Sequence, residues 1–210
     1  RMKIDTKLNI YDFGAELLRT RDLDPVYVLL WEARLEDSLL RRWLLAYWSF
    51  YNVGTASWIA DAGDGRYWDR MRKAAGCKDY PRCHERRHFR GENALGSVSW
   101  LAARGVEKLF QPLLSEVGYV KPLEEVMNYV QTWKQFGPWI AFKVADMIDR
   151  LGITSVRFDK GAMFLFDSPR DGADLLWETE KGSPPSNREA QSWAVDRILE
   201  RLGDEKAPPL

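Results

Sequence analysis

An excess of charge of either sign is missing from this 210-residue sequence, in which 31 Lys and Arg side chains balance 31 Asp and Glu. A formal net charge of +0 excludes a general polyanion binder, whose whole surface would be positive. Any surface for nucleic acid must therefore be a local patch. Cysteine is scarce as well. Cys77 and Cys83 are the two cysteines of the sequence, which is too few for a disulfide framework.

We also expect no targeting segment and no membrane segment. The N-terminus shows no pattern of a secretory signal peptide. Residues 43–60 carry no charge and are long enough to raise the question of a membrane helix. Ser49, Asn52 and Ser57 within this stretch, and charged residues on both sides of it, argue against that interpretation. We expect a soluble, cytoplasmic protein that enters no membrane.

Strand-like alternation is scarce and is visible only briefly, at 156–158. Helical periodicity fills most of the chain, which predicts an all-α fold. Without repeats or low-complexity blocks, we expect a single helical domain over 1–210, with 203–210 as a frayed tail. The expected helices cover 11–19, 24–32, 36–51, a short segment ending at 62, 67–75, 92–103, 106–114, 123–133, 138–151, 171–180 and about 187–202.

The most informative stretch joins two of these helices, over about 122–152. Gly137 allows an unusual backbone turn and Pro138 suits a first helical position, so the pair predicts a break and a new helix. Gly152 is well placed to end that helix. Helix, short turn and helix form a helix-hairpin-helix, which offers backbone N–H groups at a helix N-terminus to a phosphate. Gly137 and Trp139 are the expected contacts to the DNA backbone.

The continuation resembles the helix-hairpin-helix DNA glycosylases. In that family a catalytic Asp follows the hairpin glycine, just beyond a Leu-Gly helix end. Leu151-Gly152 is present here, and Asp159 stands near the corresponding position. The first glycine of the usual Gly-x-Gly hairpin is replaced, because the tripeptide reads Gln135-Phe136-Gly137. An ordinary helical turn is the alternative interpretation.

A second candidate site is the polar stretch 76–91, which has no obvious periodicity. It contains Arg82, Arg86, Arg87 and Arg90 together with His88. The planar fork of a guanidinium group suits phosphate oxygens bidentately. The cluster therefore predicts a phosphate or pyrophosphate site formed by Arg86, Arg87, Arg90 and His88. The alternative is a solvated loop whose arginines pair with acids elsewhere in the chain.

The same stretch holds every cysteine and histidine of the chain: Cys77, Cys83, His84 and His88. Their spacing matches no standard zinc finger, in which the cysteines of a pair are roughly two to four residues apart. The adjacent Cys83 and His84 would also struggle to reach one ion together. We expect no zinc-type metal site and no cofactor. A Mg²⁺ ion stays an open alternative that no pattern in the sequence supports.

A third candidate lies where the long apolar helix breaks. Tyr47 and Tyr51 are four residues apart and share a helix face, and Asn52 and Thr55 follow them. Polar groups in a buried break need hydrogen-bond partners, which a base-binding pocket or plain internal bonding would supply. Lys143, in the first turns of the helix after the hairpin, could contact a DNA phosphate or a leaving group. Surface ion pairing within its own helix is the alternative.

Three stretches, WSFYNVGTASWIAD, ERRHFRG and QFGPWIAFKVADMIDRLG, together resemble the alpha-glutamyl/putrescinyl thymine pyrophosphorylase family of bacteriophages, also called amino acid:DNA transferases. The resemblance covers roughly residues 40–165. It implies a relative of the helix-hairpin-helix glycosylases that works in the cytoplasm of an infected bacterium. The implied reaction transfers an amino acid or polyamine onto the 5-methylene carbon of pyrophosphorylated 5-hydroxymethyluracil in double-stranded DNA, releasing pyrophosphate.

The resemblance gives the candidate residues their expected roles. The hairpin would hold the DNA backbone while the target base is flipped into the pocket at the helix break. The arginine cluster, with Lys143, would stabilise the charge on departing pyrophosphate. Asp159 would accept a proton from the attacking amine or stabilise a cationic transition state. A glycosylase that excises a modified base and a non-enzymatic DNA-binding module are the alternatives, and no pattern names the amine.

Overall fold

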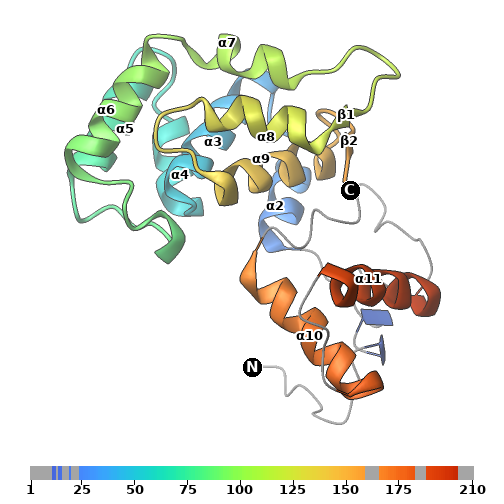
Figure 1. The fold of residues 1–210 in the computed structure, drawn as a ribbon. Coiled ribbons are helices and arrows are strands. Elements are labelled where there is room, and N and C mark those ends of the chain that lie inside the picture. The colour runs from blue at the N-terminus through green and yellow to red at the C-terminus, as the bar shows by residue number, and fades with distance from the viewer. Residues whose placement is uncertain are drawn as a thin grey trace. The chain divides into compact units, whose positions relative to one another are not determined.

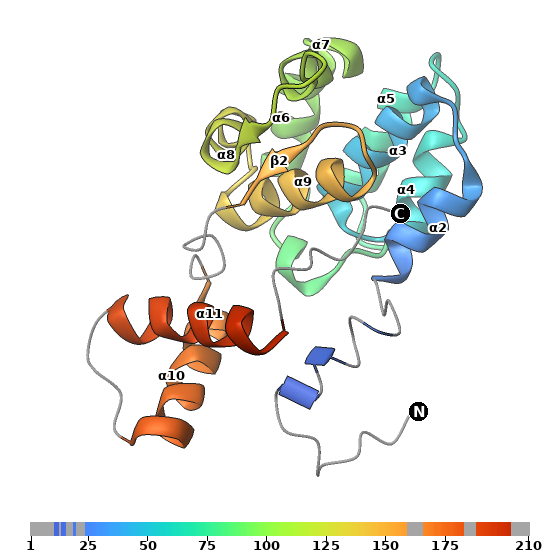
Figure 2. The same cartoon turned by 90° about the vertical axis from the view of Figure 1, so that its right-hand side faces the viewer.

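The computed structural model describes residues 11–12, 14–15, 19, 24–158, 166–182 and 188–202. Two compact units form, one from Val26–Arg157 and the other from Arg1–Pro25 with Phe158–Pro209. Helices dominate the described part of each unit (Figure 1), and the second view shows the same elements (Figure 2). The prediction of an all-α fold is confirmed. The prediction that the whole chain is one domain stays a prediction.

Each helix predicted within 24–158 is present, with ends that differ from the expected ones by a few residues. The helices are α2 (Pro25–Ala33), α3 (Asp37–Phe50), α4 (Val53–Ala60), α5 (Tyr67–Gly76), α6 (Gly91–Ala102), α7 (Val106–Phe110), α8 (Leu123–Gln131) and α9 (Pro138–Arg150). Two single-turn 3-10 helices, η1 (His84–Arg86) and η2 (Gln111–Leu113), stand between them. The first of these gives regular structure to part of the stretch 76–91, where the sequence showed no periodicity.

Helix α3 supplies the centre of the larger unit. Every side chain from Trp43 to Phe50 is buried, because this half of the helix is apolar nearly all round. Trp48 is the anchor: its ring lies 5.4 Å from that of Phe110, and its Nε1 donates to Met147 Sδ at 3.2 Å. A single fully buried tryptophan of α3 therefore contacts both α7 and α9.

The uncharged stretch 43–60 is divided between α3 and α4. Tyr51 ends α3 in the left-handed region, with φ 49°, and Asn52 caps α4. The long apolar stretch is thus two buried helices rather than one continuous span. In the part of the chain that the structure describes, no helix is long and apolar enough to cross a membrane.

Helices α8 and α9 pack on one another and are joined by residues 132–137, which we call the α8–α9 turn. Pro138 is the first residue of α9, and Gly152 follows its end with φ 67°, as predicted. The prediction that Gly137 supplies the unusual backbone turn is wrong, since its φ of −84° and ψ of −176° suit any residue. Gln135, with φ 68°, makes the left-handed turn instead. The helix-hairpin-helix motif itself stays a prediction.

A short parallel pairing fixes the chain after α9. Strands β1 (Lys121–Pro122) and β2 (Val156–Arg157) pair with Lys121 opposite Val156. The Val156 N–H also donates to Asp149 Oδ1 at 2.7 Å, so a side chain from the last turn of α9 holds the strand. The brief alternation at 156–158 thus corresponds to a strand, and Asp149 fixes the chain shortly before Asp159.

The smaller unit is built on α10 (Asp167–Lys181) and α11 (Arg188–Leu202). Helix α10 begins at Asp167, earlier than the predicted residue 171. Pro169 is compatible with this start, because it lies in the first turn, where a missing N–H costs no helical hydrogen bond. Ala173, Leu176 and Ala194 form its buried core, against which Tyr11, Trp193 and Ile198 pack.

Candidate functional site

Residues 77–90, here called the arginine loop, connect α5 to α6 and turn two of their arginines inward. Arg82 donates through Nη2 to the carbonyl oxygens of Ala74 and Cys77, both at 3.0 Å, and through Nη1 to that of Phe89. Because these carbonyls lie at both ends of the loop, Arg82 closes it. Burial lowers the pKa of this guanidinium group, and the nearby charge of Arg90 adds to the shift.

Arg86 connects the arginine loop to two other parts of the unit. Its Nε donates to the Ser49 carbonyl in α3 and its Nη1 to the Gln135 carbonyl in the α8–α9 turn, both at 2.9 Å. The guanidinium carbon lies 4.5 Å and 4.9 Å from the ring centroids of Phe89 and Phe136. The side chain is 6% exposed, and burial lowers the pKa of Arg86 to about 10, which leaves it charged at neutral pH. The guanidinium group binds backbone carbonyls in this structure. A contact between Arg86 and a phosphate therefore stays a prediction.

The other predicted phosphate ligands face solvent. Arg87, His88 and Arg90 are exposed. Arg87 Nη1 donates to the carbonyl of His84 at 3.0 Å, and no described carboxylate forms an ion pair with Arg87 or Arg90. These three side chains are therefore the part of the predicted cluster that an anion can reach.

An aromatic row runs along α3 to the first turn of α9. The ring centroids of Trp43 and Tyr47 are 5.0 Å apart, those of Tyr47 and Tyr51 4.6 Å, and those of Tyr51 and Trp139 4.9 Å. Trp43 and Tyr47 are buried, whereas Tyr51 and Trp139 are partly exposed. The structure thus brings a predicted base-pocket residue, Tyr51, against a predicted DNA-backbone residue, Trp139, at the surface.

Asn52 and Thr55 make internal hydrogen bonds. Asn52 Oδ1 accepts the Thr55 N–H at 3.0 Å, which caps α4, and Thr55 Oγ1 donates to the Pro81 carbonyl at 2.8 Å. Thr55 is 3% exposed. Internal bonding was the alternative to a base pocket, and the bond from Thr55 to Pro81 joins α4 to the arginine loop. A direct contact of either side chain with a base stays a prediction.

The predicted catalytic residues lie on and after α9. Lys143 is half-buried and forms no ion pair with a described side chain. The carboxylate of Asp146, one turn further on, instead accepts the Tyr27 hydroxyl and lies 3.9 Å from Arg150 Nε. Asp159 lies outside the described residues. Gly137 stands exposed at the cap of α9, and a Cβ added to it would meet nothing within 4 Å.

Comparison with known proteins decides the family. The model of the amino acid:DNA transferase family matches residues 10–207. This chain belongs to that family. A glycinyltransferase of Pseudomonas phage PaMx11 is similar to it, with 36% identity over 227 aligned residues that cover 97% of this chain and 77% of the relative. The resemblance recognised in three stretches of sequence is confirmed and extends over nearly the whole chain. The protein is a transferase that joins an amino acid to DNA.

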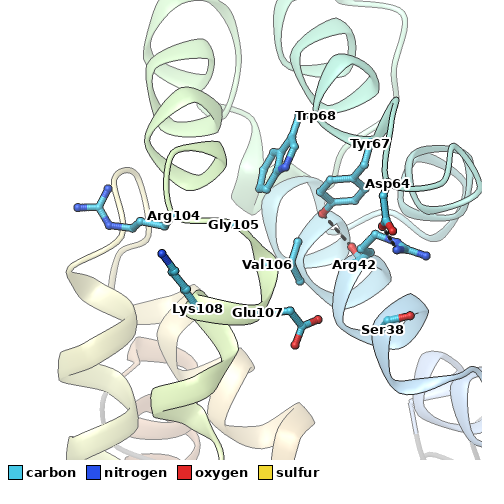
Figure 3. A pocket seen from close by; sticks show the side chains of 10 residues that line it. All are labelled: Ser38, Arg42, Asp64, Tyr67, Trp68, Arg104, Gly105, Val106, Glu107 and Lys108. Carbon is cyan, nitrogen blue, oxygen red and sulfur yellow. Dashed lines mark hydrogen bonds and ion pairs between the residues drawn. The ribbon is translucent and has the colours of Figure 1, made fainter.

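A cavity of about 510 Å³ lies elsewhere in the larger unit of the transferase, between α3, α5 and α7 (Figure 3). Arg42 pairs with Asp64, and its carbonyl accepts the Tyr67 hydroxyl at 2.9 Å. None of the predicted site residues lines this cavity. Its lining is Ser38, Arg42, Asp64, Tyr67, Trp68, Arg104, Gly105, Val106, Glu107 and Lys108, drawn from segments that share no motif.

Sequence reasoning missed the structural use of Arg82 and the pairing of Trp58 with Tyr80, whose ring centroids are 4.6 Å apart. No local pattern marks a contact between α4 and the arginine loop. Among the described residues of the transferase, no three His, Cys, Asp or Glu side chains gather to hold a metal ion. Cys77 and Cys83 are free thiols.

Proposed function

We propose that this transferase displaces pyrophosphate from pyrophosphorylated 5-hydroxymethyluracil in double-stranded DNA, and that its amino acid is glycine. The bond formed joins the amino nitrogen to the 5-methylene carbon, and the bond broken joins that carbon to the pyrophosphate oxygen. A proton leaves the attacking nitrogen. Support for glycine comes from the phage PaMx11 relative, which is named a glycinyltransferase. That phage relative also favours action in the cytoplasm of an infected bacterium, and the family description favours an amino acid over a polyamine.

The observation that carries the proposal is the hydrogen bond from Arg86 to the Gln135 carbonyl, which joins the arginine loop to the turn that starts α9. The first N–H groups of a helix have no partner within it and carry partial positive charge. With no side chain at Gly137, a DNA phosphate can approach this end closely. The exposed Arg87, His88 and Arg90 of the same loop then receive the departing pyrophosphate, while Arg86 holds the loop in place.

The flipped base is assigned to the exposed end of the aromatic row. Tyr51 and Trp139 offer ring surface next to the α8–α9 turn, and Tyr47 supports them from inside. Stacking on such rings holds a base without reading its sequence. Lys143 stabilises the leaving group, and Asp159 accepts the proton of the attacking amine. Asn52 and Thr55 shape this end of α3 through the cap of α4.

The test is mass spectrometry of nucleosides. Duplex DNA carrying pyrophosphorylated 5-hydroxymethyluracil is incubated with the protein and a mixture of glycine, serine, glutamate and putrescine, with and without EDTA, and then digested. We expect a thymidine derivative with the mass of the glycine adduct. Missing target bases would instead indicate a glycosylase, and unchanged nucleosides with retained binding would indicate a DNA-binding module. An Asp159→Asn variant with full activity would contradict the role of that carboxylate.

A further inference from the structure

We propose that α4, α5 and the start of the arginine loop form a second DNA-binding surface, which holds the strand flanking the target base. It consists of Trp58, Arg70, Lys73, Lys78 and Tyr80, and we call it the α4–α5 surface. This inference rests on the proposed function, because the partner is the same DNA. It adds a contact region that neither the α8–α9 turn nor the aromatic row provides.

An aromatic pair with cations over it forms the middle of this surface. The rings of Trp58 and Tyr80 lie 4.6 Å apart at 33°, and both side chains are half-buried. The guanidinium carbon of Arg70 lies 4.8 Å from the Trp58 ring centroid, and the Lys73 ammonium lies 5.9 Å from it. Arg70 also donates to the Trp58 carbonyl. Aromatic rings beside basic groups are the combination that binds bases or sugars together with phosphates.

Charge is concentrated around this pair. Residues 66–90 contain nine Lys and Arg side chains but only three Asp and Glu, in a chain whose total charges balance. Arg72 pairs with Asp69, whereas Arg70, Lys73 and Lys78 form no ion pair with a described carboxylate. A local excess of unpaired cations is the kind of patch that a neutral protein needs for DNA.

The arginine loop links this surface to the proposed reaction site. Near its start, the Pro81 carbonyl accepts Thr55 Oγ1 of α4, and Arg82 donates to the Ala74 carbonyl of α5. Further along, Arg86 donates to Gln135 in the α8–α9 turn. One segment of chain thus contacts both regions. DNA bound at the start of α9 can continue along the loop to Tyr80 and Lys73.

The experiment measures the Kd of a fluorescent duplex over a series of salt concentrations for Lys73→Gln, Lys78→Gln and Tyr80→Leu. Each lysine variant should weaken binding several-fold and reduce the slope of log K against log salt by about 0.9, the value for one lost phosphate contact. Tyr80→Leu should weaken binding about fivefold, with little change of slope. Lys108→Gln is the matched control, because Lys108 is an exposed lysine without a described ion-pair partner on the cavity rim.

Unfolding curves complete the test, and the curve of Lys73→Gln should match that of the unaltered protein, so that a weaker Kd reports a lost contact with DNA. Unchanged Kd and slope in the α4–α5 variants would overturn the inference, as would an equal loss in Lys108→Gln. Failure of the proposed function is recognised separately. If the unaltered protein makes no modified nucleoside but the variants lose DNA affinity as expected, the surface stands and the reaction does not.

Discussion

The arginine loop and the cavity both contain arginines near aromatic rings, but Arg42 at the cavity binds a carboxylate, whereas Arg82 and Arg86 of the loop do not. In the cavity region, Arg42 pairs with Asp64, and the lining residue Glu107 pairs with Arg41. In the loop, Arg82 and Arg86 donate to backbone carbonyls instead. A carbonyl satisfies a guanidinium N–H without cancelling its charge. The difference shows how a chain of zero net charge keeps one region positive.

The largest difference in stability between these regions is expected from the inward arginines. Arg86→Met leaves the Ser49 and Gln135 carbonyls without their donor, so the free energy of unfolding should fall by about 2–4 kcal/mol. Arg42→Met breaks an ion pair whose carboxylate partner is 87% exposed, and should cost about 1 kcal/mol or less. Urea unfolding of both variants measures the two values. Equal losses would remove the distinction between the regions.

The next effect tests how the arginine loop is tied to α4. Thr55→Val removes the hydroxyl that donates to the Pro81 carbonyl, and should lower the free energy of unfolding by about 1 kcal/mol. Thr55→Ser keeps the hydroxyl and serves as the control. Transfer activity is measured at a temperature where both variants are folded. Loss of activity in Thr55→Val alone would show that the link also positions the reaction site.

The cap of α4 gives an effect of similar size. Asn52→Ala removes the oxygen that accepts the Thr55 N–H, at a cost of about 1 kcal/mol in the free energy of unfolding. Asn52→Asp keeps a capping oxygen and should retain most of the stability. If Asn52 serves only as a cap, both variants keep the KM for DNA at a temperature where they are folded. A raised KM in Asn52→Asp would indicate direct contact with the base.

The smallest effect on stability is expected at Gly137. Because its backbone is extended and a Cβ would meet nothing, Gly137→Ala should change the free energy of unfolding by less than about 0.5 kcal/mol. It should nevertheless weaken DNA binding, since the added methyl group stands where a phosphate approaches α9. Gly152→Ala is the opposite case, because its φ of 67° costs an alanine about 1 kcal/mol. Unchanged DNA affinity in Gly137→Ala would remove the phosphate from the start of α9.

Helical periodicity predicted the elements well because it is a local property. The apolar spacing in 138–151 marked α9, and the apolar half of α3 was recognised as buried. The turn between α8 and α9 was harder. The left-handed residue is Gln135, although the sequence pointed to Gly137, because tertiary contacts such as the hydrogen bond from Arg86 hold the turn. A glycine in the sequence shows that the backbone can adopt a left-handed conformation there, but not that it does so.

The candidate site was predicted as a set of residue types, but not by their roles. Arg86 and Arg87 are neighbours in sequence, yet one is buried and the other exposed. The partners of Arg86 lie 37 and 49 residues away along the chain, so no local pattern could assign it to them. The Trp58–Tyr80 pair was missed for the same reason, since it joins α4 to a loop beyond α5.

The sequence by itself determined the helical class, the start and end of α9, and membership of the amino acid:DNA transferase family. These follow from periodicity, from proline and glycine at helix ends, and from motifs that persist in relatives. Only the tertiary structure decided that Arg82 and Arg86 turn inward to bind carbonyls while Arg87 and Arg90 stay exposed. Burial depends on contacts between residues far apart in the chain, and those contacts exist only once the helices have packed.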